Sequence, residues 1–260
     1  MIKFFRHIRK SLLNQGKTTR YFKYAIGEIL LVVIGILIAV KINTWNQNNI
    51  NDTKEQVYLT SLESDLKTQI TSMESVKKFY DSLISNAGKL LVDFQKIKSV
   101  EKIPNLNSRI SALMWDTSFT EFKTSFTELI STGNISLIKN ENLRTQIIKF
   151  YQFSESSNNS ATNNIEKVFY NIAFPIITDI AIINPSDFKI KVEGITQYNF
   201  SDGLEVEQNR QLKNPAIQKK LINAINLKIL ATTSNKNSLK NMIGFGKILL
   251  EELQKELHKK

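Results

Sequence analysis

Residues 25–40, with the sequence AIGEILLVVIGILIAV, decide the architecture of this chain. A helix that crosses a membrane needs about 20 mostly apolar residues, because the hydrocarbon core is about 30 Å thick. Residues 24–42 provide this length, and their only charged side chains, Glu28 and Lys41, lie near the two ends. Aromatic residues flank the run, as they do at both membrane interfaces: Tyr21, Tyr24 and Trp45. We therefore predict a transmembrane helix over residues 24–42 and not a buried core helix.

The charges on the two sides of this helix predict its orientation. Seven basic residues and no acidic residue precede it: Lys3, Arg6, Arg9, Lys10, Lys17, Arg20 and Lys23. Because segments rich in Lys and Arg stay on the cytoplasmic side, we expect residues 1–23 in the cytoplasm and residues 46–260 in the periplasm, anchored in the cell inner membrane. A cleaved signal peptide would need small residues before its cleavage site. Leu37 before Ala39 does not fit this need, so we expect an uncleaved, single-pass signal anchor.

Residues 1–23 have an amphipathic pattern of their own. Apolar residues share one helical face and basic residues surround it: Phe4, Phe5, Ile8 and Leu12, with Lys3, Arg6, His7 and Lys10. Such a segment lies along anionic inner-leaflet lipids, and each cation adds about 1 kcal/mol of attraction. The alternative is a solvated basic tail that serves topology alone. Both interpretations stay open.

Composition argues against two classes of function. The net charge is +11, but residues 46–260 hold 27 of the 35 basic and 23 of the 24 acidic residues, so little of the excess lies there. Without a basic stripe with interleaved aromatic residues, we expect no nucleic-acid partner. The chain has no Cys and only two His, His7 and His258. Because the usual catalytic bases and zinc ligands are missing from the exported part, we expect no enzymatic activity, no catalytic residue, no cofactor and no metal.

The segment after the anchor has a heptad pattern. Apolar residues recur every three or four positions: Leu59, Leu62, Leu66, Met73, Val76, Tyr80, Leu83, Ala87, Leu90, Phe94 and Ile97. Gln69 is the polar member of this series, and Ile70 stands beside it. Ile70, Ile84 and Leu91 widen the apolar stripe beyond that of a two-stranded coiled coil. The pattern therefore indicates a long helix inside a bundle.

Breaks and capping residues predict the next helices. After the break at Pro104, a short helix is expected to end near Trp115. Ser118 and Glu121 match a capping box, which predicts a helix from there to the stop at Gly133.

The middle of the chain predicts one long helix, for which Asn140 is the candidate cap. Residues 154–164 have the composition of a loop, which is the alternative interpretation. Four residues nevertheless continue the helical phase: Ala161, Ile165, Val168 and Ile172. We favour a helix with a polar middle, which Pro175 ends or kinks.

The last third of the chain begins with its least regular part, residues 176–213, in which the alternation over residues 190–200 permits a hairpin. Asn214 and Pro215 then predict the start of a final long helix, which the polar residues 232–238 could interrupt. The expected fold is all-α: one N-terminal transmembrane helix, then an elongated antiparallel helical bundle with long first and last helices and a small irregular insertion.

Two stretches carry a resemblance to a known family. KYAIGEILLVVIGILIAVKINTWN at residues 23–46, preceded by FFRHIRKSLL, is similar to the opening of an uncharacterised single-pass membrane-protein family of Gram-negative bacteria. ELISTGNISLIKNENLRTQIIKFY at residues 128–151 is similar to a later part of that family, and the resemblance spans nearly the whole chain. The family is a domain of unknown function, so the resemblance implies a membrane anchor and no particular activity.

Glu28, Val32, Gly35 and Ala39 form the candidate contact face of the anchor, because they fall on one side of the helix. Gly35 and Ala39 have the small-xxx-small spacing of closely packed transmembrane helices. Our hypothesis is that this face packs against a partner helix, with Glu28 hydrogen-bonded or protonated. The alternative is that Glu28 reaches the cytoplasmic headgroups near Lys23, and both stay open.

Three features of the bundle have structural and functional interpretations. Seven Phe residues are interpreted as core rather than as a ligand pocket: Phe119, Phe122, Phe126, Phe150, Phe153, Phe169 and Phe174. Residues 244–247, GFGK, resemble a phosphate loop but lack its spacing, so we interpret them as a close helix contact. Trp115 and Asp116 fit either an exposed recognition point or a buried turn.

Two function classes follow. The first is an interaction or sensing module that acts through another membrane or envelope protein, or through self-association. The second is a structural spacer in the cell envelope. The lipid bilayer is the one partner that both classes require.

Overall fold

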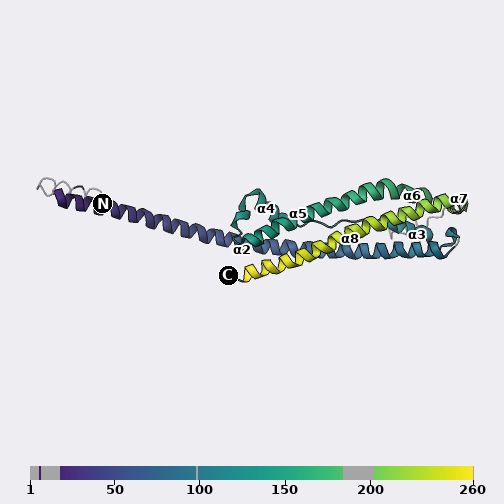
Figure 1. The fold of residues 1–260 in the computed structure, drawn as a ribbon, viewed down its shortest axis with the longest axis horizontal. Helices are drawn as coiled ribbons and strands as arrows, with labels where there is room; N and C mark the ends of the chain where they lie inside the picture. The colour runs from purple at the N-terminus through teal and green to yellow at the C-terminus, as the bar shows by residue number, and fades with distance from the viewer. Residues whose placement is uncertain (1–5, 7–17, 98, 184–201, 260) are drawn as a thin grey trace, which may run out of the picture. The chain divides into compact units, whose positions relative to one another are not determined.

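The computed structural model describes residues 6, 18–97, 99–183 and 202–259 (Figure 1). These residues are mostly helical, with no strand among them, which confirms the all-α class. The chain divides into two compact units, Met1–Val57 and Tyr58–Lys260. The long helix α2 (Thr18–Lys96) contributes residues to both units.

In the first unit, α2 contains the whole apolar run. Residues 24–42 are helical throughout, as predicted. Within the described part of the chain, α2 is the one helix that is long and apolar enough to cross a membrane. Every large apolar side chain from Ile26 to Ile42 is at least 46% exposed, so this stretch has no protein core around it. The amphipathic pattern predicted for residues 1–23 falls mostly outside the described residues.

Three long helical stretches build the second unit (Figure 1). They are the later part of α2, the continuous run α5 (Glu141–Asn163), η4 (Asn164–Ala173) and α6 (Phe174–Ile180), and finally α8 (Pro215–His258). Shorter helices lie between them: η1 (Val100–Lys102), α3 (Leu106–Ser111), η2 (Ala112–Met114), α4 (Thr124–Ser131), η3 (Asn134–Leu137) and α7 (Asp202–Leu212). The long first and last helices were predicted, whereas α7 was not.

Polar contacts show that α2 and α8 are antiparallel. Residue numbers rise along α2 and fall along α8 from one pair to the next: Glu63 with Gln254, Glu74 with Lys247, and Asp81 with Lys236.

The heptad pattern of α2 forms the core, as predicted. Its members from Leu59 to Leu90 are buried, and Gln69 is fully buried with them. The side chains divide into two hydrophobic clusters, each built from several elements. The first cluster draws on residues 59–80, 119–151 and 239–253. The second draws on residues 83–113, 169–181 and 212–225.

Two predicted helix caps are confirmed. Asn140 Oδ1 accepts the N–H of Leu143 at 3.1 Å at the start of α5. Asn214 Oδ1 accepts the N–H of Ala216 at 2.9 Å at the start of α8, with Pro215 in the first turn. In both places a short polar side chain satisfies an N–H group that the helix itself leaves unpaired.

The predicted capping box at Ser118 and Glu121 is wrong. Residues 115–123 are not helical, and α4 begins only at Thr124. The reason is a tertiary contact, because Asp65 Oδ2 of α2 accepts the N–H of Ser125 at 2.9 Å and thereby caps α4 from another helix.

The helical interpretation of residues 154–164 is confirmed, but the helical phase beyond them is not. The segment η4 is a π-helix, whose i→i+5 hydrogen bonds reduce the turn per residue below that of an α-helix. As a result Phe169 and Ala173 are fully buried, whereas Ile172 is 47% exposed. Pro175 lies in the first turn of α6 and does not end the run.

The final helix α8 is continuous through residues 232–238, so the polar interruption that we considered is absent. Thr232 and Asn235 are buried instead. The hairpin considered for residues 190–200 lies outside the described residues.

Candidate functional site

The predicted contact face of the anchor lies on α2. Glu28, Val32, Gly35 and Ala39 follow steps of four, three and four residues, which keep them on one side of the helix. Val32 is 53% exposed, and no atom lies within 4 Å of the position that a Cβ on Gly35 would occupy. The face therefore has room for another helix backbone over Gly35.

The predicted interface anchors also lie on α2. Tyr24 is 55% and Trp45 65% exposed, and the ring of Tyr21 packs edge-on against Phe22 with centroids 5.9 Å apart. Of the topogenic basic residues, Arg20 and Lys23 lie on α2 and Arg6 is exposed. The remaining four lie outside the described residues: Lys3, Arg9, Lys10 and Lys17.

The most unusual group in the second unit is a buried lysine that the sequence analysis missed. The side chain of Lys228 on α8 is 1% exposed, and that of its partner Asp116 is 9% exposed. Lys228 Nζ donates to Asp116 Oδ2 at 2.7 Å and to the carbonyl oxygen of Trp115 at 3.0 Å. It also lies 3.8 Å from the ring centroid of Phe169, a cation–π contact. Burial lowers the pKa of Lys228, and the charge of Asp116 opposes this shift.

This ionic centre resolves the two interpretations of Trp115 and Asp116. The Trp115 side chain is 48% exposed, whereas its carbonyl oxygen and the neighbouring carboxylate of Asp116 point into the protein and bind Lys228. The dipeptide therefore exposes the Trp115 ring, whereas the Trp115 carbonyl oxygen and the Asp116 carboxylate contact Lys228 in the interior.

Further polar side chains lie beside this centre, between the two hydrophobic clusters. Asn164 Nδ2 donates to Asn235 Oδ1 at 2.8 Å, and Ser238 Oγ donates to Ser157 Oγ at 3.0 Å. We call the following set the polar layer: Ser157, Asn164, Lys228, Thr232, Asn235 and Ser238. It joins α8 to α5 and η4 through directional bonds, which a purely apolar core would not provide.

A second chain of hydrogen bonds joins α2, α5 and the non-helical segment 115–123. Gln69 Nε2 donates to Ser154 Oγ at 2.8 Å, and Ser154 Oγ donates to Glu121 Oε1 at 3.2 Å. Lys123 Nζ lies 2.8 Å from the same carboxylate. The polar position of the heptad pattern thus contacts α5, which in turn contacts the non-helical segment 115–123.

One small cavity adjoins the polar layer. Its volume is about 10 Å³, which is the space for a single water molecule. Tyr80 lines it and donates its hydroxyl to the carbonyl oxygen of Thr117 at 2.6 Å. Burial raises the pKa of Tyr80. This cavity is too small for an organic ligand.

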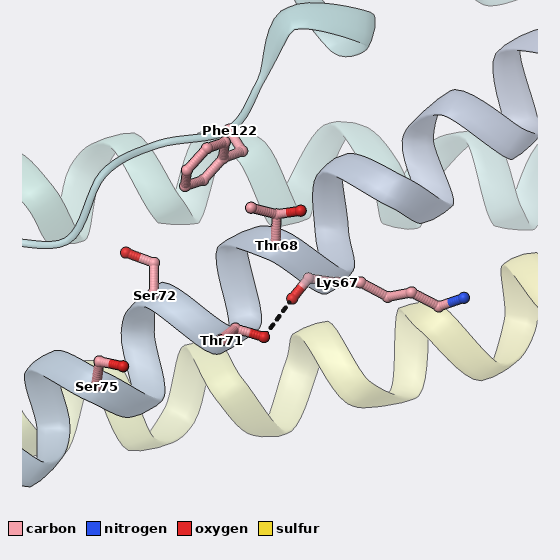
Figure 2. Close-up of a pocket in the computed structure, with 6 residues that line it drawn as sticks. All are labelled: Lys67, Thr68, Thr71, Ser72, Ser75 and Phe122. Carbon is pink, nitrogen blue, oxygen red and sulfur yellow. Dashed lines mark hydrogen bonds between the residues drawn. The ribbon is translucent and has the colours of Figure 1, made fainter.

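A larger groove of about 450 Å³ is lined by residues of α2 and by Phe122 (Figure 2). Figure 2 shows Thr68 and Ser72 pointing toward the segment that carries Phe122. The polar lining is already engaged, since Thr71 Oγ1 donates to its own helix at the carbonyl oxygen of Lys67, and Ser72 Oγ accepts the N–H of Thr120. A ligand would have to compete with these bonds, so the groove is a poor candidate for a specific site.

Two structural interpretations from the sequence hold. Six of the seven Phe residues are buried or partly buried, and only Phe153 is exposed, at 39%. A Cβ on Gly246 would lie 3.2 Å from both Ile70 and Phe150, so this glycine permits a close helix contact, as expected. Among the described residues, no group of three or more His, Cys, Asp or Glu side chains is placed to hold a metal ion.

Comparison with known proteins gives one match. A family of unknown function (DUF6090) matches residues 28–156, just under half of the chain. The matched range contains most of the apolar run, the first long helix of the bundle and Asp116, but not Lys228. No curated protein and no solved structure matches.

Proposed function

We propose that this chain is a single-pass membrane protein whose helical bundle, on the non-cytoplasmic side, is an interaction or sensing module that acts through a partner protein. The observation that carries the proposal is the exposure of the apolar run. Twelve large Ile, Leu and Val side chains between residues 26 and 42 are each at least 46% exposed. A bilayer removes this surface from water.

The free energy of insertion supports this assignment. Each such side chain favours insertion by about 0.3–0.6 kcal/mol, so the twelve contribute about 4–7 kcal/mol. Glu28 opposes insertion, but its place near one end of the run lets it reach the interface at a lower cost than at the midplane. The basic residues before the run favour a cytoplasmic amino end.

Two observations favour a role through protein contacts over a role in catalysis. Lys228 and Asp116 are buried and bind each other, and Thr71 and Ser72 in the groove beside Phe122 are hydrogen-bonded within the protein. The family match joins part of the anchor and the first half of the bundle in one range, which fits a protein whose anchor and bundle work together.

The anchor face is the candidate site for a partner helix. Gly35→Ile places a branched side chain where the two helix backbones would approach, so it should weaken association. Gly27→Ile is the matched control, because Gly27 also has open space around it and lies about 100° around the helix from Glu28. Both variants keep the apolar length of the run.

Affinity purification of the full chain from solubilised membranes tests the proposal. A stoichiometric second protein that is lost with Gly35→Ile and retained with Gly27→Ile supports it. Self-association alone, equal in both variants, would instead favour the structural spacer and contradict the proposal.

A further inference from the structure

Residues 161–180 carry two overlapping apolar stripes. An α-helical phase would bury one of them: Ala161, Ile165, Val168 and Ile172. Beyond Ala161 the structure most deeply buries the other: Phe169, Ala173, Ile177 and Ile180. Val168 with Ile172 and Phe169 with Ala173 have nearly the same number of side-chain carbons. Burial of either pair therefore gains a similar free energy, and apolar area alone does not choose the register.

The register that the structure adopts has local costs. π-helices are rare and usually last a single turn, whereas η4 extends over ten residues. Tyr170 and Ile172 remain 47% exposed in it. An α-helical register would recover the burial of Ile172 and ordinary i→i+4 hydrogen bonds.

Contacts with the polar layer offset these costs. The π-helix places the Phe169 ring 3.8 Å from Lys228 Nζ, and Lys228 is fixed in turn by Asp116. At the start of η4, Asn164 donates to Asn235. The first of these contacts requires residue 169 to face α8, which an α-helical phase continued from Ala161 would not provide.

We propose that residues 164–173 form a two-register switch. The Lys228–Asp116 pair and the Phe169 ring hold the π-helical register, and loss of this latch returns the segment to an α-helical register that buries Ile172 in place of Ala173. Burying residue 172 in place of residue 173 shifts the helical phase by one residue, so the change over the whole segment rotates the following helix, α6, by about 100° around its axis. The ionic centre thereby controls the orientation of α6. This inference does not depend on the proposed membrane function.

The absence of Cys from the chain permits a direct test with single cysteines. Ile172→Cys and Ala173→Cys are introduced separately into the full chain in detergent micelles, and their rates of maleimide labelling are measured. In the otherwise native chain, Cys at 172 should react at least tenfold faster than Cys at 173. The same pair is then measured with Lys228→Met and Asp116→Asn combined, which removes both buried charges together.

The proposal expects the order of the two rates to reverse in this background. Lys240→Met with Asp81→Asn is the control background, because Lys240 is exposed and Asp81 is in a partly exposed ion pair with Lys77. If Cys at 172 still reacts faster than Cys at 173 when Lys228→Met and Asp116→Asn are combined, the proposal is overturned. Met73→Cys reports on the first hydrophobic cluster, and if it also becomes reactive, the latch supports the whole fold rather than one register, which equally overturns the proposal.

Discussion

Asp116→Asn tests the ionic centre, because it leaves the Lys228 ammonium buried without an opposite charge. Removing one partner of a buried ion pair costs about 3–5 kcal/mol. The amide oxygen of Asn can still accept a hydrogen bond from Nζ, so we expect the lower end, about 3 kcal/mol. For a domain of about 200 residues this lowers the melting temperature by roughly 6–12 °C. Circular dichroism of the full chain in detergent measures the change.

The control for this variant is Asp81→Asn. Asp81 lies 2.6 Å from Lys236 and 3.0 Å from Lys77, but its side chain is 42% exposed. Exposed pairs contribute about 0–1 kcal/mol, so the melting temperature should change little. Equal losses in the two variants would refute the reasoning that burial makes the Lys228–Asp116 pair special.

The same variant makes a prediction about pH. Burial already lowers the pKa of Lys228, and the carboxylate of Asp116 opposes that effect, so the pKa falls further in Asp116→Asn. Between this lowered folded value and the unfolded value of about 10.4, the unfolded chain binds more protons, so stability rises with pH. The deficit of Asp116→Asn relative to the native chain should therefore shrink between about pH 7 and pH 10. If the stability difference between Asp116→Asn and the native chain does not change with pH, the loss of stability does not come from burial of the Lys228 charge.

Three further substitutions test other parts of the bundle by thermal unfolding of the full chain. Gly246→Leu should cost about 1–3 kcal/mol or more, since the added side chain overlaps neighbours 3.2 Å away, whereas Gly244→Leu has open space and should be tolerated; equal effects would contradict the close contact. Asp65→Ala should cost about 1 kcal/mol, because the N–H of Ser125 loses its cap; no loss would mean that α4 starts for another reason. Gln69→Leu should be neutral or slightly stabilising, because the buried Oε1 of Gln69 has no hydrogen-bond partner in the structure. A loss of stability above about 2 kcal/mol would show that the bond from Gln69 to Ser154 stabilises the fold by more than the unpaired Oε1 costs.

The helices that could be predicted are those whose burial follows one uninterrupted period. The pattern from Leu59 to Leu90 steps by three and four, and each of its members is buried. The same spacing continues on α8 from Leu221 through Lys228 and Asn235 to Leu253, so the burial of Lys228 was available from the sequence. A charged residue on the buried stripe of a helix was the signal that we missed.

What the sequence did not reveal depends on contacts between distant segments. Asp116 lies in a non-helical segment that has no period, so nothing in the sequence pairs it with Lys228. The start of α4 depends on Asp65 from another helix, and a local capping pattern at Ser118 predicted the wrong boundary. The register of η4 depends on the contact between Phe169 and Lys228, which an extrapolated α-helical phase does not contain.

The central claim is that residues 24–42 cross a membrane with the bundle on the non-cytoplasmic side. Single cysteines at Ser11, Ile34 and Ser64 test it in intact spheroplasts treated with a membrane-impermeant maleimide. We predict labelling at position 64 only, labelling at position 11 only after lysis, and none at position 34, although Ile34 is 50% exposed in the structure. Labelling at position 34, or at position 11 before lysis, would contradict the account.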